Sequence, residues 1–281
     1  MPGEDLTRKV RSLTGHEIFP FSTLVNSGTD ELVRLIRSSI PENLLKTPTL
    51  LGDVIKYGDI VMLITPIDVE APEGRLILPQ VQAIRDILDN DAIAVVLKER
   101  EVDAFLEKTK VRPALAITDS QIFVKADASV PSDIPLTSFS IALARMKGDF
   151  DSYLAGTPGI SELKDGDRVL LLESCTHHVS CDDIGRVKIP RWITGFTGAR
   201  LEFDVVAGLD KLPRPITDYS LVIQCGGCMI TRKQLINRLQ PAIKAGIPVT
   251  NYGMAIAWVQ GIYRRAIAPF TGHQPGAEDY L

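Results

Sequence analysis

The sequence predicts an α/β protein of two domains whose sheets are largely parallel. Short apolar runs with little polar alternation, and helix-like runs between them, are typical of buried parallel strands joined by helices. The chain has 281 residues, of which 45% are hydrophobic. Because single cores stop growing at about 250–300 residues, a chain of this length divides most simply into two compact parts. The apolar content also excludes a disordered chain.

Composition excludes two classes of partner. The 31 basic and 35 acidic side chains give a formal net charge of -4. Binding to nucleic acid or to an anionic membrane would require a basic face, so neither is expected. The most apolar stretch, residues 60–67, is far shorter than the roughly 20 residues of a membrane-spanning helix. With no signal-peptide pattern at its start, the chain is expected in the cytoplasm.

The first segment, residues 1–46, contains one clear helix signal. Thr29 can cap a helix whose apolar residues share one face and which ends before Pro41. A piece of this size is too small to hold a core of its own.

The second segment, residues 47–157, alternates strand-like and helix-like runs. These runs cover residues 60–65, 78–88, 92–97, 102–106 and 114–118, and a further helix is expected over 137–146. The sequence Thr157-Pro158-Gly159 is interpreted as the boundary to the next domain.

The third segment, residues 158–281, reads as four short strands interleaved with helices. Strands are expected at 168–172, 201–206, 220–223 and 248–250, and helices near 190–196, 231–244 and 251–263. No internal repeat is apparent. In open parallel sheets, binding sites form at the carboxyl ends of strands. Cysteines follow two of these strands, Cys175 after the first and both Cys225 and Cys228 after the third.

The cysteines form the most informative pattern in the chain. Cys225-Gly226-Gly227-Cys228 precedes a helix expected from Thr231, whose positive end would favour thiolates, and the paired glycines allow a tight turn. Cys175-Thr176-His177 adds a third sulfur and an imidazole. Three thiolates from two strand ends could hold one metal centre with an open corner.

Two other interpretations fit the same residues. The CxxC pair could be a redox dithiol, in which Cys225 attacks a disulfide and Cys228 resolves it. Alternatively, Cys175, Cys225, Cys228 and a histidine could bind a structural zinc ion. Spacing alone does not separate zinc from an iron-sulfur cluster. Cys181 has no assigned role in any of the three.

Several strings resemble the HydF family, the iron-sulfur scaffold proteins of [FeFe]-hydrogenase maturation. Cys175-Thr176-His177 and Gln224-Cys225-Gly226-Gly227-Cys228 resemble the CxH…HCxxC motif of this family. Residues 183–192 and 250–253 look like its cluster domain. Residues 74–80, 118–121 and 136–140 look like its dimerisation domain.

The resemblance implies a [4Fe-4S] cluster held by Cys175, Cys225 and Cys228, with a labile fourth position. The family usually has histidine before the CxxC, whereas this chain has Gln224, and a neutral amide is a poor iron ligand. His177 is the first candidate for the fourth ligand. The alternatives are a carboxylate such as Glu173 or Asp182, solvent, or an incoming ligand.

By the same resemblance the chain is a non-catalytic scaffold. It would carry a transient diiron precursor with CO and CN ligands to the apo-hydrogenase, alongside the radical-SAM maturases, and would form a homodimer or a higher homo-oligomer. No G-x-x-x-x-G-K-S/T phosphate loop occurs, so no GTP site is expected. Residues 1–46 are interpreted as a GTPase-domain remnant, 47–157 as the dimerisation domain and 158–281 as the iron-sulfur cluster-binding domain.

Overall fold

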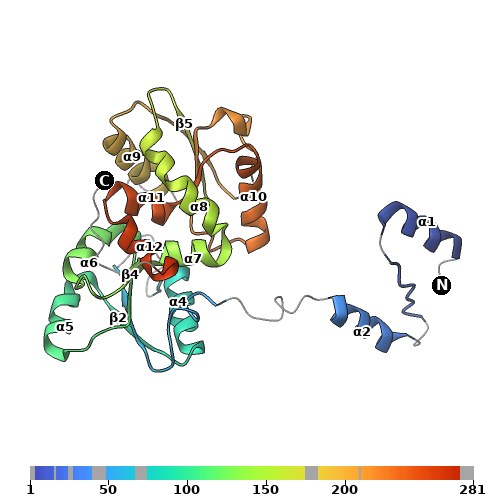
Figure 1. Ribbon diagram of the computed structural model, residues 1–281, viewed down its shortest axis with the longest axis horizontal. Helices are drawn as coiled ribbons and strands as arrows, with labels where there is room; N and C mark the ends of the chain where they lie inside the picture. The colour runs from blue at the N-terminus through green and yellow to red at the C-terminus, as the bar shows by residue number, and fades with distance from the viewer. Residues whose placement is uncertain are drawn as a thin grey trace. The chain divides into compact units, whose positions relative to one another are not determined.

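The computed structural model describes residues 4–15, 17–24, 28–39, 49–66, 75–174, 183–208 and 210–272. The chain divides into two compact units, Met1–Pro48 and Thr49–Leu281. Unit 1 contains α1 (Glu4–Thr14) and α2 (Thr29–Ser39), which agrees with the helix expected from Thr29 (Figure 1). No residue of α2 is buried.

Unit 2 begins with a four-stranded parallel sheet, in which buried β1 and β3 are central. The strands are β1 (Ile60–Ile64), β2 (Ile93–Leu97), β3 (Leu115–Thr118) and β4 (Leu136–Ser138), in the order β2-β1-β3-β4. The helices are α4 (Leu78–Asp89), α5 (Val102–Thr109), α6 (Phe123–Ser129), α7 (Phe139–Lys147) and α8 (Phe150–Gly156).

The second sheet is also parallel and four-stranded. Its strands are β5 (Arg168–Leu172), β6 (Glu202–Val206), β7 (Leu221–Gln224) and β8 (Val249–Asn251), in the order β6-β5-β7-β8. The helices are α9 (Ile189–Thr197), α10 (Arg232–Lys244), α11 (Tyr252–Val259) and α12 (Tyr263–Thr271). The predicted α/β class with parallel sheets is therefore confirmed.

Two predicted helices have different limits. The helix expected over 137–146 begins at Phe139, because residues 136–138 pair with β3 instead. The helix expected over 251–263 is two helices, since Gly261 adopts φ +74° and turns the chain between α11 and α12. The segment Thr157–Glu162 forms a 3-10 helix, η3, in which Thr157 is fully buried.

The two sheets of unit 2 repeat one architecture, which corrects the expectation of no internal repeat. Both have the strand order 2-1-3-4, and the turn before each first strand is the same. In the first, the Asp59 carboxylate accepts the Lys56 N–H at 2.8 Å; in the second, Asp167 accepts the Lys164 N–H at 2.7 Å. The glycine between each pair has φ +78° or +87°, a conformation that glycine adopts without strain.

A second matched segment carries the repeat into the helices. Residues 136–148 read LTSFSIALARMKG and residues 249–261 read VTNYGMAIAWVQG, so Thr, both Ala and the last Gly recur in register. Each segment is a short strand followed by a helix, α7 or α11. The identities are too sparse to reveal the repeat without the shared strand order.

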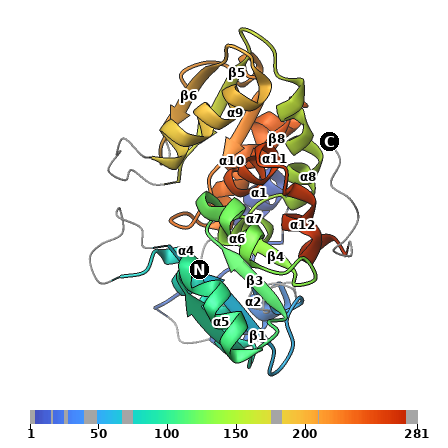
Figure 2. The ribbon, with the colours of Figure 1, turned by 90° about the vertical axis from the view of Figure 1, so that its left-hand side faces the viewer.

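Unit 2 thus has two halves, the first containing the sheet β1–β4 and the second the sheet β5–β8. Contacts between the two halves are reciprocal. Helix α8 packs on β8 of the second half, and α12 packs on β4 of the first half. The Thr137 hydroxyl donates to the carbonyl of Ala266 in α12 at 2.8 Å, and the matching Thr250 hydroxyl lies 2.6 Å from that of Thr157. Reciprocity of this kind is what an approximate two-fold relation produces. Figure 2 shows α7 and α11 between the two sheets, and these helices contact each other.

Hydrophobic packing is continuous between the halves. One cluster joins Met62 and Ala116 of the first sheet to Val169 and Val222 of the second. Unit 2 is therefore a single folded body. Among the described residues, no helix is long and apolar enough to cross a membrane.

Candidate metal centre at the carboxyl edge of the second sheet

The CxxC loop lies where the strand order of the second sheet reverses. Cys225 directly follows β7, next to the end of β5, and its N–H donates to the Leu172 carbonyl at 2.9 Å. This is the position at which open α/β sheets bind ligands. Two of the three predicted sulfur ligands, Cys225 and Cys228, are thus placed. Cys175, His177 and Cys181 lie outside the described residues.

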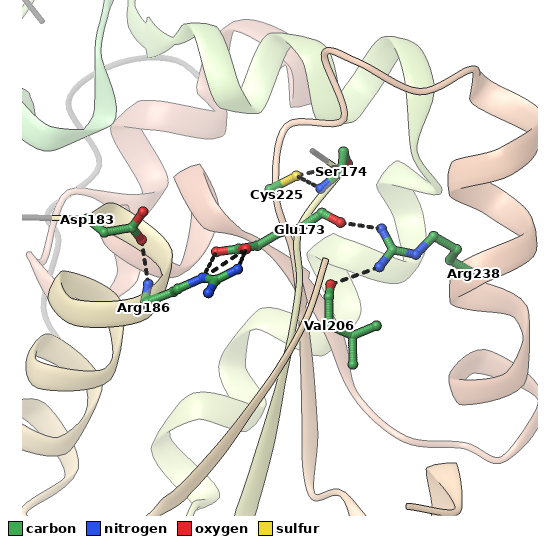
Figure 3. Close-up of polar contacts among 7 residues, drawn as sticks. All are labelled: Glu173, Ser174, Asp183, Arg186, Val206, Cys225 and Arg238. Atoms are coloured by element: carbon green, nitrogen blue, oxygen red, sulfur yellow. Dashed lines mark hydrogen bonds and ion pairs between the residues drawn. The ribbon is translucent and has the colours of Figure 1, made fainter. Parts of the chain in front are cut away.

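Hydrogen-bond donors surround the Cys225 sulfur. The Ser174 N–H donates to Sγ at 3.1 Å, the Ser174 hydroxyl lies 2.9 Å from it, and the Gln224 amide lies 3.4 Å from it (Figure 3 shows the Ser174 contacts). Because Gln224 Nε2 also donates to Ser174 Oγ at 3.1 Å, the hydroxyl proton is free to point at the sulfur. Ser174 and Gln224 are buried. Such a set of donors stabilises a sulfur that carries negative charge.

The two glycines of the loop have different roles. Gly227 adopts φ +70°, and a Cβ there would lie 2.4 Å from Cδ1 of Leu235. Gly226 has a negative φ, and its nearest neighbour to an added Cβ, Leu143, is at 3.6 Å. Only the second glycine is therefore required by the turn, whereas the sequence suggested both.

The Cys228 thiol contradicts the expected helix effect. Burial raises the pKa of this thiol, and the nearby Cys225 raises it further, while Lys147 and two backbone N–H groups lower it. Helix α10 begins at Arg232 with Thr231 as its N-cap, where it was expected, so burial outweighs any effect of the helix on this pKa. The metal-free loop therefore keeps Cys228 as a thiol more readily than an ordinary cysteine, and a metal would have to displace that proton.

Glu173, at the end of β5, has a partner of its own. Its carboxylate is buried, and Arg186 binds both oxygens, with Nη2 to Oε2 at 2.8 Å (Figure 3). Arg186 lies in η4 (Ile184–Lys188), a π-helical turn capped by the Asp183 carboxylate. The pKa of Arg186 is raised by this hydrogen bond to Glu173. The carboxylate suggested as a fourth ligand is therefore already paired.

Breaking this pair should destabilise the fold. Arg186→Met would leave Glu173, with only 2% of its side chain exposed, charged and unpaired. We expect a loss of about 3 kcal/mol, the low end for a buried pair, because Arg186 is itself one third exposed. Urea unfolding measures this loss. The double variant Glu173→Gln with Arg186→Met should recover most of it, and equal instability of both proteins would contradict the assignment.

Arg238 of α10 ties the strand ends together. Its Nη1 donates to the Glu173 carbonyl at 2.7 Å, and its Nη2 donates to the Val206 carbonyl at 3.0 Å (Figure 3). These carbonyls lie at the carboxyl ends of β5 and β6, so the guanidinium holds the two strand ends together at the edge of the sheet that carries the CxxC loop. Burial raises the pKa of the Tyr252 hydroxyl well above its ordinary value.

Sequence reasoning missed the residues that support the cysteines. Ser174 lies 51 positions before Cys225 in the chain, and Arg238 lies in the helix that follows the cysteine loop, so no local pattern joins them. One signal was available: Glu173 directly follows the apolar run at residues 169–172, and a charge at such a position requires a partner.

The donor set fits a thiolate-bound metal, although only part of it is described. Within the residues that the structure describes, no group of three or more His, Cys, Asp or Glu side chains comes together. The chemistry of the site therefore depends on Cys225, whose sulfur is surrounded by donors, and on Cys228. Thiolate ligands of this kind suit zinc or iron-sulfur clusters.

Fold and site together define a two-part α/β protein that presents a cysteine pair at the switch point of a parallel sheet. Comparison with known families is specific: the Hydrogen maturase F dimerization domain matches residues 50–148, and the Hydrogen maturase F tetramerization domain matches residues 151–269. The chain belongs to the hydrogen maturase F (HydF) family. Its domains accordingly assign it to hydrogenase maturation and to a homo-oligomer.

Other comparisons add little. No curated protein matches the chain. An NtrC family transcriptional regulator from Clostridium acetobutylicum is 13% identical, with a TM-score of 0.23 over 74% of this chain and 97% of that one. A carbohydrate transporter from Acidothermus cellulolyticus 11B, in complex with myo-inositol, is 13% identical, with a TM-score of 0.24 over 78% of this chain and 90% of that one. Similarities with TM-scores this low establish neither a shared fold nor a shared function.

Proposed function

We propose that this protein is a non-catalytic scaffold that holds a [4Fe-4S] cluster on Cys175, Cys225 and Cys228 and carries a diiron precursor to the apo-[FeFe]-hydrogenase. The observation that carries the proposal is the set of donors around the Cys225 sulfur. Hydrogen bonds to ligand sulfurs are a main determinant of cluster potential. When bound, the cluster would supply an iron atom to which the precursor attaches.

The described side chains support an exchangeable fourth position. Glu173 is engaged by Arg186, and the Gln224 amide is directed to Ser174 and Cys225. Neither is free to occupy a fourth iron site. His177, Asp182, solvent or the precursor itself remain as candidates, and a weakly held ligand suits a carrier because cargo must enter and leave.

Anaerobic reconstitution tests the proposal. The purified chain is incubated with ferrous iron and sulfide and desalted, and its iron, sulfide and zinc are measured. We expect about four iron and four sulfide per chain, the content of one cubane cluster. One tightly held zinc without sulfide would favour the structural zinc site. A metal-free chain that exchanges disulfides would favour the dithiol.

We also propose that β2 forms part of the subunit interface. It is an edge strand of the first sheet, and Ile93 and Val96 are 50% and 42% exposed. Leu78, Val81 and Leu88 of α4 are exposed as well. The matching edge strand of the second sheet, β6, carries Glu202, which pairs with Arg168. Natural edges are usually protected by such charges, so an apolar edge in a dimerization domain fits a second copy of the chain.

The repeat supplies a substitution that tests this interface. Ile93 pairs with Ile60 as Glu202 pairs with Arg168, so Ile93→Glu gives β2 the residue found in β6. We expect self-association at this surface to weaken at least tenfold, since a charge would be buried without a partner. Sedimentation velocity measures the mass, with Ile93→Val as the matched control. An unchanged mass for Ile93→Glu would contradict the assignment.

A further inference from the structure

Lys147 belongs to the first half of unit 2, yet it binds the loop between the two cysteines in the second half. It is the last residue of α7. Its Nζ lies 3.0 Å from the Gly227 carbonyl, 3.2 Å from the Cys228 carbonyl and 3.3 Å from the Ile230 carbonyl. Because an ammonium group has three donors and no acceptor, three carbonyls satisfy it fully.

The internal repeat indicates that the shared fold does not require this contact. Lys147 and Gln260 occupy the same position in the matched segments 136–148 and 249–261. The Gln260 Oε1 atom has no hydrogen-bond partner among the described residues. Lys147 thus makes a contact that its matched residue does not make in the described part of the chain, and this contact reaches the half that carries the cysteines. We therefore relate the contact to the cysteine site rather than to the shared fold.

Peptide geometry connects Lys147 to the Cys228 sulfur. The carbonyl of Gly227 and the N–H of Cys228 belong to one planar peptide group, as do the carbonyl of Cys228 and the N–H of Met229. Lys147 binds both carbonyls. These two peptide groups flank the Cα atom of Cys228, which carries the sulfur. Lys147 therefore holds the backbone on both sides of the Cys228 side chain.

We propose that Lys147 is a positioning residue for Cys228. It fixes the two peptide groups that flank the Cys228 side chain, and it places a positive charge beside the cysteine loop. The first sheet's half thus contributes to the metal centre of the second. Only the effect on a bound cluster rests on the proposed function, because the ordering of the loop is a property of the metal-free chain.

Hydrogen–deuterium exchange of the metal-free protein tests the positioning. Lys147→Met removes the donors and the charge while keeping most of the apolar stem. We expect amide exchange over residues 225–231 to rise at least tenfold, with exchange in β5 and β7 unchanged. Gln260→Met, at the matched position, should leave the loop at the wild-type rate. Wild-type exchange of the loop in Lys147→Met would overturn the proposal, whatever metal the protein binds.

The reduction potential of the reconstituted protein supplies a readout that loop ordering alone would not move. A positive charge and N–H donors stabilise the more negative, reduced cluster. We expect the midpoint potential of Lys147→Met to become more negative and that of Lys147→Arg, which keeps the charge, to stay near wild type. An equal shift in both variants would overturn the electrostatic part of the proposal. A wild-type chain that binds no cluster, yet has a Lys147-dependent loop, would refute the proposed function alone.

Discussion

Serine in place of Cys175, Cys225 or Cys228 should each abolish stable cluster loading. Loss of an outer hydrogen-bond partner already costs about 10–100-fold in metal affinity, so loss of a ligand sulfur should cost at least as much. Iron and sulfide bound after anaerobic reconstitution and desalting measure the effect. Ser174→Ala, which removes a partner of the Cys225 sulfur, should give an intermediate loss.

Cys181→Ser is the matched control, since it removes a thiol with no assigned ligand role. It should load as the wild type does. Full loading of Cys225→Ser, together with loss of disulfide exchange, would contradict the scaffold and favour the dithiol. Loss of loading in Cys181→Ser would instead extend the ligand set to a fourth cysteine.

Strand positions were predictable from the sequence because buried parallel strands are short apolar runs. Residues 168–172 and 60–65 were predicted as strands on this pattern, and the structure has β5 and β1 at these positions. The order of strands and the exchange of α8 and α12 between the halves were not predictable, because they depend on contacts between residues far apart in the chain. Thr137 and Ala266, for example, are 129 positions apart. Strand β4 was missed since its last two residues, Thr137 and Ser138, were assigned to the start of the helix that follows.

The site was predictable only where it is local. The spacing of Cys225 and Cys228 and their place after a strand follow from the sequence alone. Lys147 binds the Cys228 carbonyl from 81 positions away in the chain, and no motif spans that distance, whereas Arg186 pairs with Glu173 from 13 positions away. The expectation of a helix-stabilised thiolate at Cys228 was wrong because burial and the neighbouring Cys225 raise the pKa of its thiol, although the helix begins where it was expected.

Gly156→Ala should be among the most destabilising single-methyl changes in the fold. The backbone at Gly156 is right-handed helical, with φ -90° and ψ -20°, so alanine is not excluded by its own conformation. The obstacle is β8: an added Cβ would lie 2.2 Å from the carbonyl oxygen of Val249 and 2.5 Å from its nitrogen. Backbone atoms of a central packing contact cannot rotate away, so α8 must move off the strand. We expect a loss of about 3 kcal/mol, measured by urea unfolding.

Gly195→Ala provides the matched control, because Gly195 lies exposed inside α9 with nothing within 4 Å of an added Cβ. It should stabilise the protein by about 0.5–1 kcal/mol, the usual gain of alanine over glycine in a helix. The loss at Gly156 should also reach the metal centre. Displacing α8 would shift β8, whose Asn251 amide donates to the Gln224 carbonyl at 3.2 Å directly before Cys225. Gly156→Ala should therefore load less cluster than Gly195→Ala under identical conditions, and equal stability and loading of the two variants would show that α8 does not hold the site in place.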